Sequence, residues 1–584
     1  MICTVFEIII AAAFIWLAIS KLMPRHGWPF VVSIATVLLC ACAAYFASQY
    51  ISVPTTEVTI KALDQHITGE NGQVYLAHYC ADGAEYPVQD AVEGNWFWMN
   101  GNYVWLEESD ERLEETVTQE IAVNVPVGFS RKIVFVKNQW KGLVQVDDGA
   151  SVQTFDTASV ASAPIGAEAM KTLMWILERC LVFALVLGIS ALGFMGLISL
   201  ISKRFYKPQK EQSEEISEVP VKMDGKLVWV ELLRLVGCVG IIALHIAGSY
   251  FLLLDPNTVA WNVDNFFHGV MRYGVPIFLM ITGVLYFSAD KPISIRRIWG
   301  SKIPNFLFRY AFWAVVYACL AAVLDHAKGT PLQIAKAIVI DAIKAPASIL
   351  WYLLALVEIL IIIPLVKPAV CSRNGKRICE YMLAVWFIFA VIKRTVDYCW
   401  FIPHLDYIML IYNKIFSNSF SSWIGFSVLG YYLYQYGPRL NNTKRSRIGL
   451  AALGVVSISG GVILTSVYCN NSGSVSEAFY NNFSVVQLVW SVSIFMSFSS
   501  WVSQHRFSEN ACRIITDLSS LTLGVYLMHL FFARILLKLP SFGTEMLMVD
   551  PLGTIVVRWT LTTVFTFVCV FILRKIPVLR KYVV

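Results

Sequence analysis

The chain has 584 residues, of which 57% are hydrophobic and only 15% are charged, and its mean hydropathy is +0.61. This composition excludes an ordinary soluble globular protein and predicts a polytopic membrane protein. The net charge of +6 does not indicate nucleic-acid binding, because Lys and Arg stand in short clusters between apolar runs, as they do in cytoplasmic loops.

The thirteen cysteines do not indicate metal or thiol chemistry. Most of them lie inside apolar runs, where a thiol acts as a small apolar side chain. The sequence has no CxxC pair and no Cys/His spacing typical of a metal site, and Cys80 is the only cysteine of the long polar segment. We therefore expect no metal site and no permanently bound cofactor.

Apolar runs account for most of the chain. A membrane-spanning helix needs about 20 mostly apolar residues, and the sequence holds thirteen such runs. They are centred near residues 12, 39, 187, 242, 277, 314, 358, 385, 428, 458, 491, 528 and 563. The first run is predicted to be retained, because Glu7 precedes its core and Lys21 and Arg25 follow it, where a cleaved signal peptide has small residues.

The distribution of Lys and Arg predicts the orientation. If the amino terminus is outside, the loops assigned to the cytoplasm hold 26 Lys or Arg, and the opposite short loops hold about six. We therefore expect a multi-pass protein of the cell membrane with a cytoplasmic carboxy terminus. Residues 50–168 then lie on the extracytoplasmic side.

Residues 50–168 form a long polar segment. Its patches alternate polar and apolar residues, as in "EVTIKA", "GQVYLAHY" and "RKIVFV", and turn sequences such as "NGN" and "DDGAS" separate them. About 120 residues suffice for one compact domain. We predict an extracytoplasmic all-β sandwich or jelly-roll-like domain.

Four tryptophans stand out in this segment: Trp96, Trp98, Trp105 and Trp140. Exposed indole faces could stack on sugar rings. Tryptophan in a small β domain is more often part of the core, and that is the reading we favour.

The remaining boundaries follow from composition. Residues 203–225 mix both charge signs without apolar periodicity and predict a cytoplasmic linker. Before this linker we expect two spanning helices at 1–49 and a third at 169–202, on either side of the β domain. After it, residues 226–584 hold ten apolar runs.

Two ionisable residues stand in the first of these ten runs, "VELLRLVGCVGIIALHIAGSYF". Arg234 and His245 are eleven residues apart, so they project from nearly the same helix face, separated by roughly 16 Å along the axis. Arg234 could be an interfacial residue or a partner of Glu231. His245 is expected near mid-membrane, where it is either a hydrogen-bonded structural residue or a proton acceptor facing a cavity.

Further segments follow in a characteristic order along this part of the chain. With the first run they are "ELLRLVGCVGIIALH", "YGVPIFLMITGVLYF", "IRRIWGSKIPNFLF", "LWYLLALVEILIIIPLV", "IGFSVLGYYL", "LSSLTLGVYLMH" and "IPVLRK". This ordered set resembles the acyltransferase-3 family of bacterial membrane-bound acyltransferases. The resemblance covers about residues 226 to 584, and ten helices is the family's count.

The resemblance implies an enzyme that moves an acyl group, commonly acetyl, from cytoplasmic acyl-coenzyme A to a hydroxyl of an envelope glycan. Arg234 and His245 match the Arg and His that the family needs, with His245 as general base or, alternatively, as acyl carrier. Arg296, Arg297 and Lys302 match a basic turn that engages the acyl donor. Lys302 stands where Arg is common and lacks its fork, and positive-inside charge alone also explains the three residues.

The implied partners follow from the same resemblance. Acyl-coenzyme A is the co-substrate, and its phosphates should lie among inner-surface cations while the pantetheine arm reaches inward. The acceptor is a glycan or lipid-linked saccharide, and the enzyme sits in the lipid of the bacterial inner membrane, with polysaccharide-assembly proteins as possible partners.

Four further polar residues stand in apolar surroundings. Glu358 needs a partner or protonation and either orients the site or forms a structural pair. Tyr526 and His529, which the family shares, either line the same cavity or pack with satisfied hydrogen bonds. Arg272 is expected at the outer end of its helix, where it contacts lipid headgroups or an anionic acceptor.

Two rival functions fit parts of the sequence. An envelope-saccharide transporter or flippase would use the same polar residues as a pathway, but no inverted repeat or pair of broken helices is visible. A sensor that signals across the membrane would need a cytoplasmic output domain, and the sequence has no pattern of one.

Overall fold

The computed structural model falls into two compact units, which are described separately. The N-terminal unit comprises Met1–Arg25, Pro29–Lys207 and Ser541–Val557, and the helical unit comprises His26–Trp28, Pro208–Pro540 and Arg558–Val584. The residues that the structure describes are 2–22, 28–49, 51–63, 73–88, 92–94, 96–99, 102–106, 118–136, 143–157, 161–205, 222–223, 226–287, 293–325, 330–344, 348–397, 423–437, 443–504 and 507–582.

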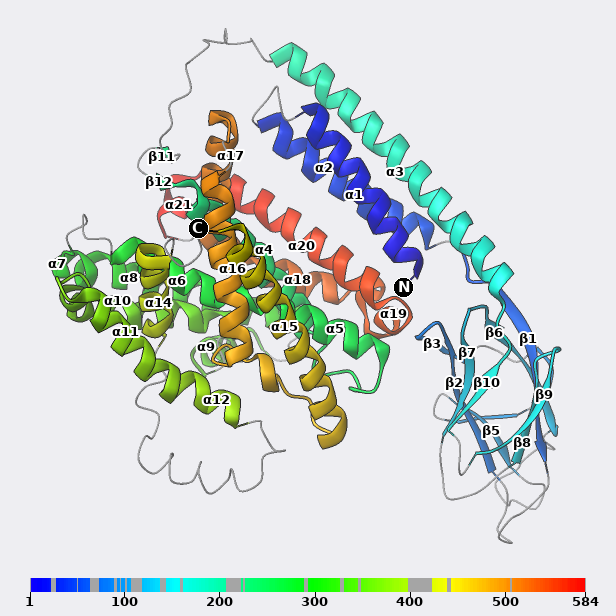
Figure 1. The fold of residues 1–584 in the computed structure, drawn as a ribbon. Helices are drawn as coiled ribbons and strands as arrows, with labels where there is room; N and C mark the ends of the chain where they lie inside the picture. Colours follow the sequence, from blue (N-terminus) through cyan, green and yellow to red (C-terminus); the bar gives the residue numbers. More distant parts are fainter. Residues whose placement is uncertain are drawn as a thin grey trace. The chain divides into compact units, whose positions relative to one another are not determined.

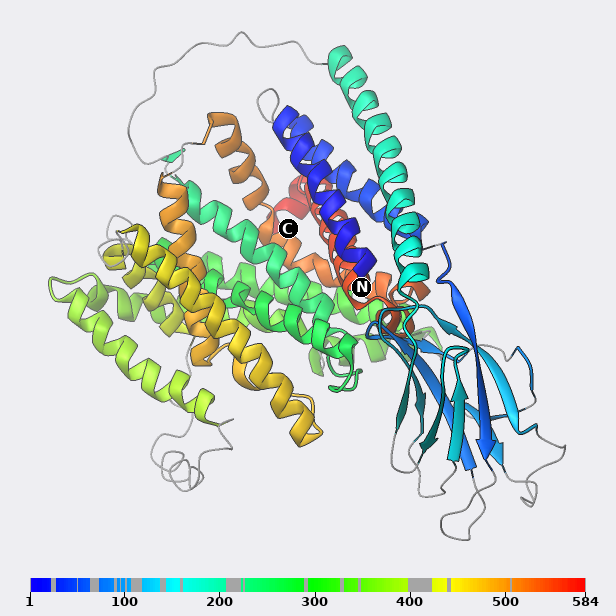
Figure 2. The same cartoon turned by 45° about the vertical axis from the view of Figure 1, so that its right-hand side comes forward.

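Three helices of the N-terminal unit lie side by side (Figures 1 and 2). They are α1 (Ile2–Leu22), α2 (Trp28–Ser48) and α3 (Ala169–Phe205). A row of large apolar side chains on α3 is exposed, including Leu173, Leu181 and Ile189. Such an extended apolar surface is expected of a helix that faces lipid.

Ten strands form two antiparallel sheets between α2 and α3. One sheet has the order β6-β1-β8-β9, and the other has the order β10-β7-β2-β5-β4, with β3 paired to β2. The strands are β1 (Thr55–Leu63), β2 (Gln73–Ala81), β3 (Ala84–Pro87), β4 (Phe97–Met99), β5 (Asn102–Leu106), β6 (Glu120–Pro126), β7 (Arg131–Phe135), β8 (Leu143–Asp147), β9 (Val152–Asp156) and β10 (Ser162–Ile165).

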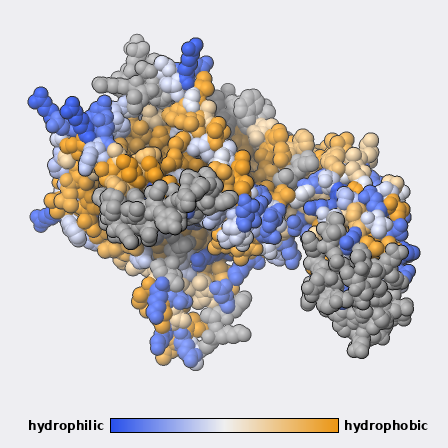
Figure 3. Space-filling model, turned by 60° about the horizontal axis from the view of Figure 1, so that its bottom comes forward, coloured by the Kyte–Doolittle hydropathy of each residue, from blue (hydrophilic) through white to orange (hydrophobic). Residues whose placement is uncertain are grey.

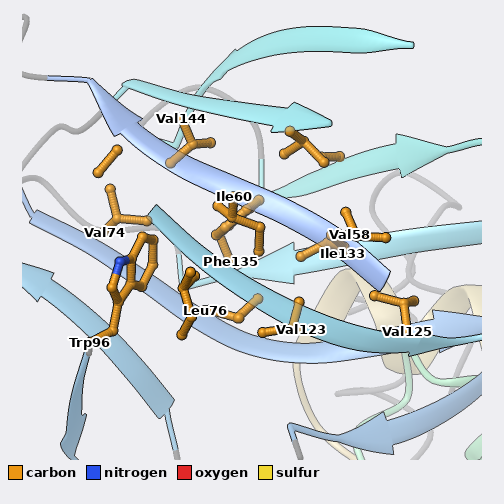
Figure 4. Close-up of a cluster of buried hydrophobic side chains, with 14 of the residues drawn as sticks. Val58, Ile60, Val74, Leu76, Trp96, Val123, Val125, Ile133, Phe135 and Val144 are labelled. Carbon is orange, nitrogen blue, oxygen red and sulfur yellow. The ribbon is translucent and has the colours of Figure 1, made fainter. Parts of the chain in front are cut away.

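The two sheets enclose one apolar core (Figure 4). Ile60 and Val123 come from the first sheet, and Leu76 and Phe135 come from the second; all four are buried in the same cluster. The alternation of the strand sequences produces this core, because successive side chains of a strand face opposite sides of the sheet. The prediction of a β sandwich is therefore confirmed.

The tryptophans of this domain divide between core and surface. Trp96 and Trp105 are each 3% exposed and belong to the core, as predicted. Trp98 is 52% exposed, with its ring edge against Tyr103. Trp140 lies outside the described residues.

The "DDGAS" sequence forms a turn in the sandwich, with Gly149 at a φ of 79°. The Asp148 carboxylate accepts hydrogen bonds from the backbone N–H groups of Ala150 (3.0 Å), Ser151 (2.8 Å) and Gly166 (2.5 Å). Burial alone would raise the pKa of Asp148, but these three donors stabilise the ionised form and hold the pKa below its ordinary value.

A group of buried polar side chains joins α1, α2 and α3 to residue 550, which precedes α20 (Pro551–Leu573). Arg179 of α3 lies 3.1 Å from Glu7 of α1 and 3.7 Å from Asp550. Asp550 also accepts hydrogen bonds from the hydroxyls of Thr4 (2.6 Å) and Tyr45 (3.0 Å). One guanidinium can neutralise only one of the two carboxylates, so the hydroxyl donors are needed to stabilise the group in the protein interior.

The helical unit is built from two short strands and a series of helices. The strands are β11 (Lys222–Met223) and β12 (Lys226–Leu227). The helices are α4 (Val228–Gly248), α5 (Val259–Val270), η1 (Met271–Tyr273), α6 (Gly274–Tyr286), α7 (Ile295–Arg297), η2 (Ile298–Lys302), α8 (Ile303–Leu324), α9 (Pro331–Lys344), η3 (Ser348–Leu350), α10 (Trp351–Val370), α11 (Gly375–Trp386), η4 (Phe387–Ile392), α12 (Lys393–Val396), α14 (Ile424–Tyr436), α15 (Lys444–Ser472), η6 (Ala478–Tyr480), α16 (Val485–Gln504), α17 (Glu509–Ser519), α18 (Thr522–Leu537) and α21 (Pro577–Tyr582), with most of α20. The N-terminal unit holds η7 (Pro540–Phe542), whose first residue belongs to the helical unit, and α19 (Thr544–Val549).

Close contacts show how the helices around α4 run. Gly237 of α4 faces Phe278 of α6, and Ile241 of α4 faces Gly274 of α6, so residue numbers fall along α6 as they rise along α4, and the two helices are antiparallel. The Cys238 thiol lies 3.7 Å from the Thr522 carbonyl oxygen at the start of α18. Further along, His245 lies beside His529, so α18 runs parallel to α4.

The polytopic helical fold is confirmed, although fewer helices than thirteen pass as spans. Within the described residues, eight helices are long and apolar enough to cross a membrane, or nine if the bent pair α17 and α18 is one span. These nine match predicted runs. The runs near 12, 39, 385 and 428 form helices that are shorter or less apolar over their described lengths. Figure 3 shows hydrophobic residues covering much of the surface between hydrophilic patches.

Candidate active site

The N-terminal end of α4 carries a compact polar group. The Arg234 guanidinium lies 3.3 Å from the buried Glu231 carboxylate one turn earlier. The same carboxylate accepts a 2.5 Å hydrogen bond from the Ser519 hydroxyl of α17. The partnership of Arg234 with Glu231, one of the two alternatives from the sequence, is therefore present.

The C-terminal end of α4 brings two histidines together. His245 lies in the last turn of the helix, and its ring centroid is 5.2 Å from that of His529 on α18. Nδ1 of His529 lies 2.6 Å from the Tyr526 carbonyl oxygen, and Nε2 has no hydrogen-bond partner in the described part of the chain. Since only a protonated Nδ1 can donate to that carbonyl, Nε2 of a neutral His529 keeps its lone pair.

Tyr526 stands one turn before His529 on α18. Its hydroxyl donates to the Ile349 carbonyl oxygen at 2.5 Å, and its ring lies 5.2 Å from that of Tyr352. Both alternatives from the sequence hold for this residue, because its hydrogen bond is satisfied and its side chain also lines the cavity described below.

The expected position of Arg272 is wrong. The helix does not begin at residue 273, since α5, η1 and α6 form one apolar stretch from Val259 to Tyr286 and place Arg272 within it. Arg272 is 7% exposed, and both terminal nitrogens bind the Glu477 carboxylate, while Nη2 lies 3.2 Å from His268 Nε2. The Glu477 carboxylate pairs with this charge inside the unit, and a contact with a lipid headgroup or an anionic acceptor stays a prediction.

A cavity of about 920 Å³ opens beside His245. His245, Arg272 and Tyr526 line it, while His529 lies against His245. The other lining residues that bear on its chemistry are His268, Trp351, Lys393, Arg394, Trp423, Glu477, Arg534 and Arg558. The cavity therefore combines imidazoles, cations and indole rings at the C-terminal end of α4.

The basic turn lies away from this cavity. Arg296 and Arg297 are exposed, and Lys302 donates a 2.8 Å hydrogen bond to the Tyr286 hydroxyl, with its ammonium 4.3 Å from that ring's centroid. Because the turn follows the C-terminal end of α6, which is antiparallel to α4, it lies towards the same end of α4 as Arg234. The predicted donor residues therefore gather at the opposite end from His245.

Glu358 stands in the middle of α10 and is half-buried. It takes part in at least one polar, ionic or ring interaction, but it does not line the cavity. Its assignment as a site residue stays a prediction.

The sequence reasoning missed several residues of the cavity. One of them is His268, which stands four residues before Arg272 on one apolar helix, a spacing that could have marked a polar face. Arg534 and Arg558 stand inside the apolar helices α18 and α20, where an arginine among apolar residues was a signal that could have found them. Glu477 carried no such signal, because it lies between α15 and η6, outside the apolar runs.

A separate group of possible metal ligands lies in the β domain. Ligand atoms of His78, Cys80 and Glu85 lie within 4.8 Å of one another. Burial raises the pKa of the Cys80 thiol to about 11 and lowers the pKa of His78. Binding of a metal here would have to displace the thiol proton, and the expectation of no metal site stays a prediction.

These features define an integral-membrane helical protein with a basic, histidine-containing cavity among its helices. A family model described as an acyltransferase domain matches residues 227–575, from the junction before α4 to just beyond α20. The chain therefore belongs to the acyltransferase-3 family, as the resemblance predicted. No curated protein matches the chain.

Proposed function

We propose that the protein is a membrane-bound O-acyltransferase that moves an acyl group, most simply acetyl, from cytoplasmic acyl-coenzyme A to a hydroxyl of an extracytoplasmic or lipid-linked glycan. The observation that carries this proposal is the pairing of His245 with His529 beside a cavity in a chain of the acyltransferase-3 family.

His245 is the proposed general base. Its imidazole takes the proton of the acceptor hydroxyl as the hydroxyl oxygen bonds to the thioester carbonyl carbon. The carbon–sulfur bond then breaks, and the coenzyme A thiolate receives the proton from His245. His529 is a positioning residue, because its Nε2 lone pair can accept a hydrogen bond from the neighbouring imidazole and select its tautomer.

The donor is proposed to enter from the other end of α4. Coenzyme A is a polyanion, and Arg296, Arg297 and Lys302 offer cations beside the end that carries Arg234. Arg234 lies roughly 16 Å along the axis from His245, a gap that the narrow pantetheine arm would bridge. No metal or resident cofactor is invoked.

The topology belongs to the same proposal. The excess of Lys and Arg supports an orientation with the N-terminal end of α4 and the carboxy terminus in the cytoplasm and the β sandwich outside. The sandwich would then hold or select the acceptor. The transporter alternative gains no specific support, whereas family membership supports acyl transfer.

The test uses purified full-length protein with acetyl-coenzyme A labelled in the acetyl group. We expect turnover that His245→Ala lowers about 10²- to 10⁴-fold, the usual contribution of general acid–base catalysis. Lys336→Ala, on the exposed side of α9, is the control and should keep full activity. A folded His245→Ala protein with unchanged turnover would overturn the assignment of the base.

A further inference from the structure

The cavity beside His245 is far more cationic than a neutral sugar requires. Five cations and one carboxylate line it: Arg272, Lys393, Arg394, Arg534, Arg558 and Glu477. Saccharide hydroxyls are recognised by neutral donors and acceptors, whereas a surplus of guanidinium and ammonium groups favours an anion.

Two carboxylates near the cavity already form ion pairs with cations of the protein. Glu477 binds Arg272, and Asp397 lies 3.5 Å from Lys393 and 3.8 Å from Arg394. Arg534 and Arg558 have no carboxylate within 4.0 Å among the residues that the structure describes. Arg558 does interact electrostatically with the buried Asp264 carboxylate and lies over the Tyr250 ring, but neither guanidinium is held in a close ion pair in the described part of the chain.

Arg558 is built into the wall of the cavity. It is 1% exposed, and its Nη2 donates to the Ala533 carbonyl oxygen at 2.8 Å and to the Ser249 hydroxyl at 3.3 Å. Its Nε and Nη1 have no hydrogen-bond partner in the described chain, and neither has the buried carboxylate of Asp264. An unsatisfied buried guanidinium is costly, and an oxyanion in the cavity would satisfy it.

The position of Arg558 connects it to the reactive end of α4. The Ser249 hydroxyl that it contacts donates to the His245 carbonyl oxygen at 2.8 Å. Arg534 directly follows Ala533, whose carbonyl Arg558 binds, so the Arg558 guanidinium of α20 reaches the α18 backbone next to Arg534. An anion held there would lie close to the proposed site of transfer.

An aromatic surface accompanies the cations. Trp351 and Trp423 both line the cavity, with ring centroids 4.8 Å apart and planes inclined by 33°. Indole faces give apolar area at which the C–H face of a sugar ring can pack. The cavity thus offers surfaces for both an anionic group and a pyranose ring.

These cations are distinct from the basic turn proposed for coenzyme A. Arg558 contacts Ser249, which caps the C-terminal end of α4, whereas Lys302 follows α6 and lies towards the N-terminal end. One molecule of donor would have to span the helix to use both sets.

We propose that the acceptor is a saccharide that carries a phosphate or carboxylate, which Arg534 and Arg558 bind by charge-assisted hydrogen bonds while the sugar ring lies on Trp351 and Trp423. This inference rests on the proposed function, since it names the acceptor's class.

The experiment measures binding without any acyl donor. Intrinsic tryptophan fluorescence of the purified full-length protein is titrated with glucose 1-phosphate, methyl glucuronide, methyl glucoside and inorganic phosphate. We expect at least one anionic sugar to bind about 10- to 100-fold more tightly than methyl glucoside and than phosphate, since a charge-assisted hydrogen bond contributes on that scale. Arg534→Gln and Arg558→Lys should each remove most of this difference, and Arg513→Gln on the exposed face of α17 should not.

Equal binding of the neutral and both anionic sugars would overturn the proposal, and so would unchanged binding by a folded Arg534→Gln protein. If inorganic phosphate bound as tightly as glucose 1-phosphate, the cavity would be an anion site without sugar recognition, and the proposal would fail. It would also fail if coenzyme A competed with the sugars, because the two arginines would then bind the donor. A protein that binds the anionic sugars but shows no acyl transfer in the separate labelled assay would refute the proposed function alone.

Discussion

The polar groups at the two ends of α4 differ in whether they have partners within the protein. At the N-terminal end, Glu231 accepts from both Arg234 and Ser519, so the charge is matched within the protein. At the C-terminal end, His245 meets His529, and Arg558 keeps donors without partners in the described chain. A matched pair can hold a shape in the absence of ligand, whereas unmatched groups gain from a substrate. The difference separates a proposed entry for the donor from a proposed place of reaction.

The largest effect on stability is expected from removing a charge at the cavity, beside the C-terminal end of α4. Glu477→Gln leaves Arg272 buried without its carboxylate, and we expect a loss of about 2–4 kcal/mol of unfolding free energy, because an uncompensated buried charge is costly and Glu477 is itself partly exposed. Thermal or denaturant unfolding in detergent measures the loss.

Glu509→Gln makes the same chemical change in an exposed pair with Arg513 and should cost less than about 0.5 kcal/mol. If both variants unfolded alike, the Arg272 pair would have no special part in holding the cavity.

The opposite end is tested by Arg234→Gln. If Arg234 guides the donor and leaves the chemistry to His245, KM for acetyl-coenzyme A should rise about tenfold, the value of one charge-assisted hydrogen bond, with kcat changing much less. Steady-state kinetics over a range of donor concentrations separates the two constants.

Arg513→Gln provides the matched control and should leave both constants unaltered. A fall in kcat at constant KM would show that Arg234 acts in the chemical step. The proposal that one end of α4 guides the donor and the other carries the chemistry would then be wrong.

The smallest effect is expected at the basic turn. Lys302 is already engaged by the Tyr286 hydroxyl and ring, and Arg296 and Arg297 stand beside it, so Lys302→Gln should raise the donor KM only about threefold, as for a partly exposed charge. Lys376→Gln, also exposed, should have no effect on the same kinetic assay. A loss as large as that of Arg234→Gln would make Lys302 a principal phosphate contact.

Local sequence patterns predicted much of this molecule and little of its long-range pairing. Period-two alternation identified the sandwich, and the spacing of Arg234 and His245 predicted that one helix carries both, although His245, expected near mid-membrane, lies in the last turn of α4. Arg272 was misplaced because its carboxylate partner lies 205 residues away, and the Ser249 contact of Arg558 lies 309 residues away. No helical or strand period relates residues across such distances, so only the packed fold reveals them.

The buried group around Arg179 and Asp550 also sets an order of events during synthesis. Thr4 and Asp550 are 546 residues apart, so α1, α2 and α3 are made long before their last carboxylate leaves the ribosome. Glu7 and Arg179 can neutralise each other early, but the hydroxyls of Thr4 and Tyr45 wait for their acceptor. The buried polar group of the N-terminal unit is therefore completed only when translation has almost ended. A chain truncated before residue 550 would lack the carboxylate that accepts these hydrogen bonds.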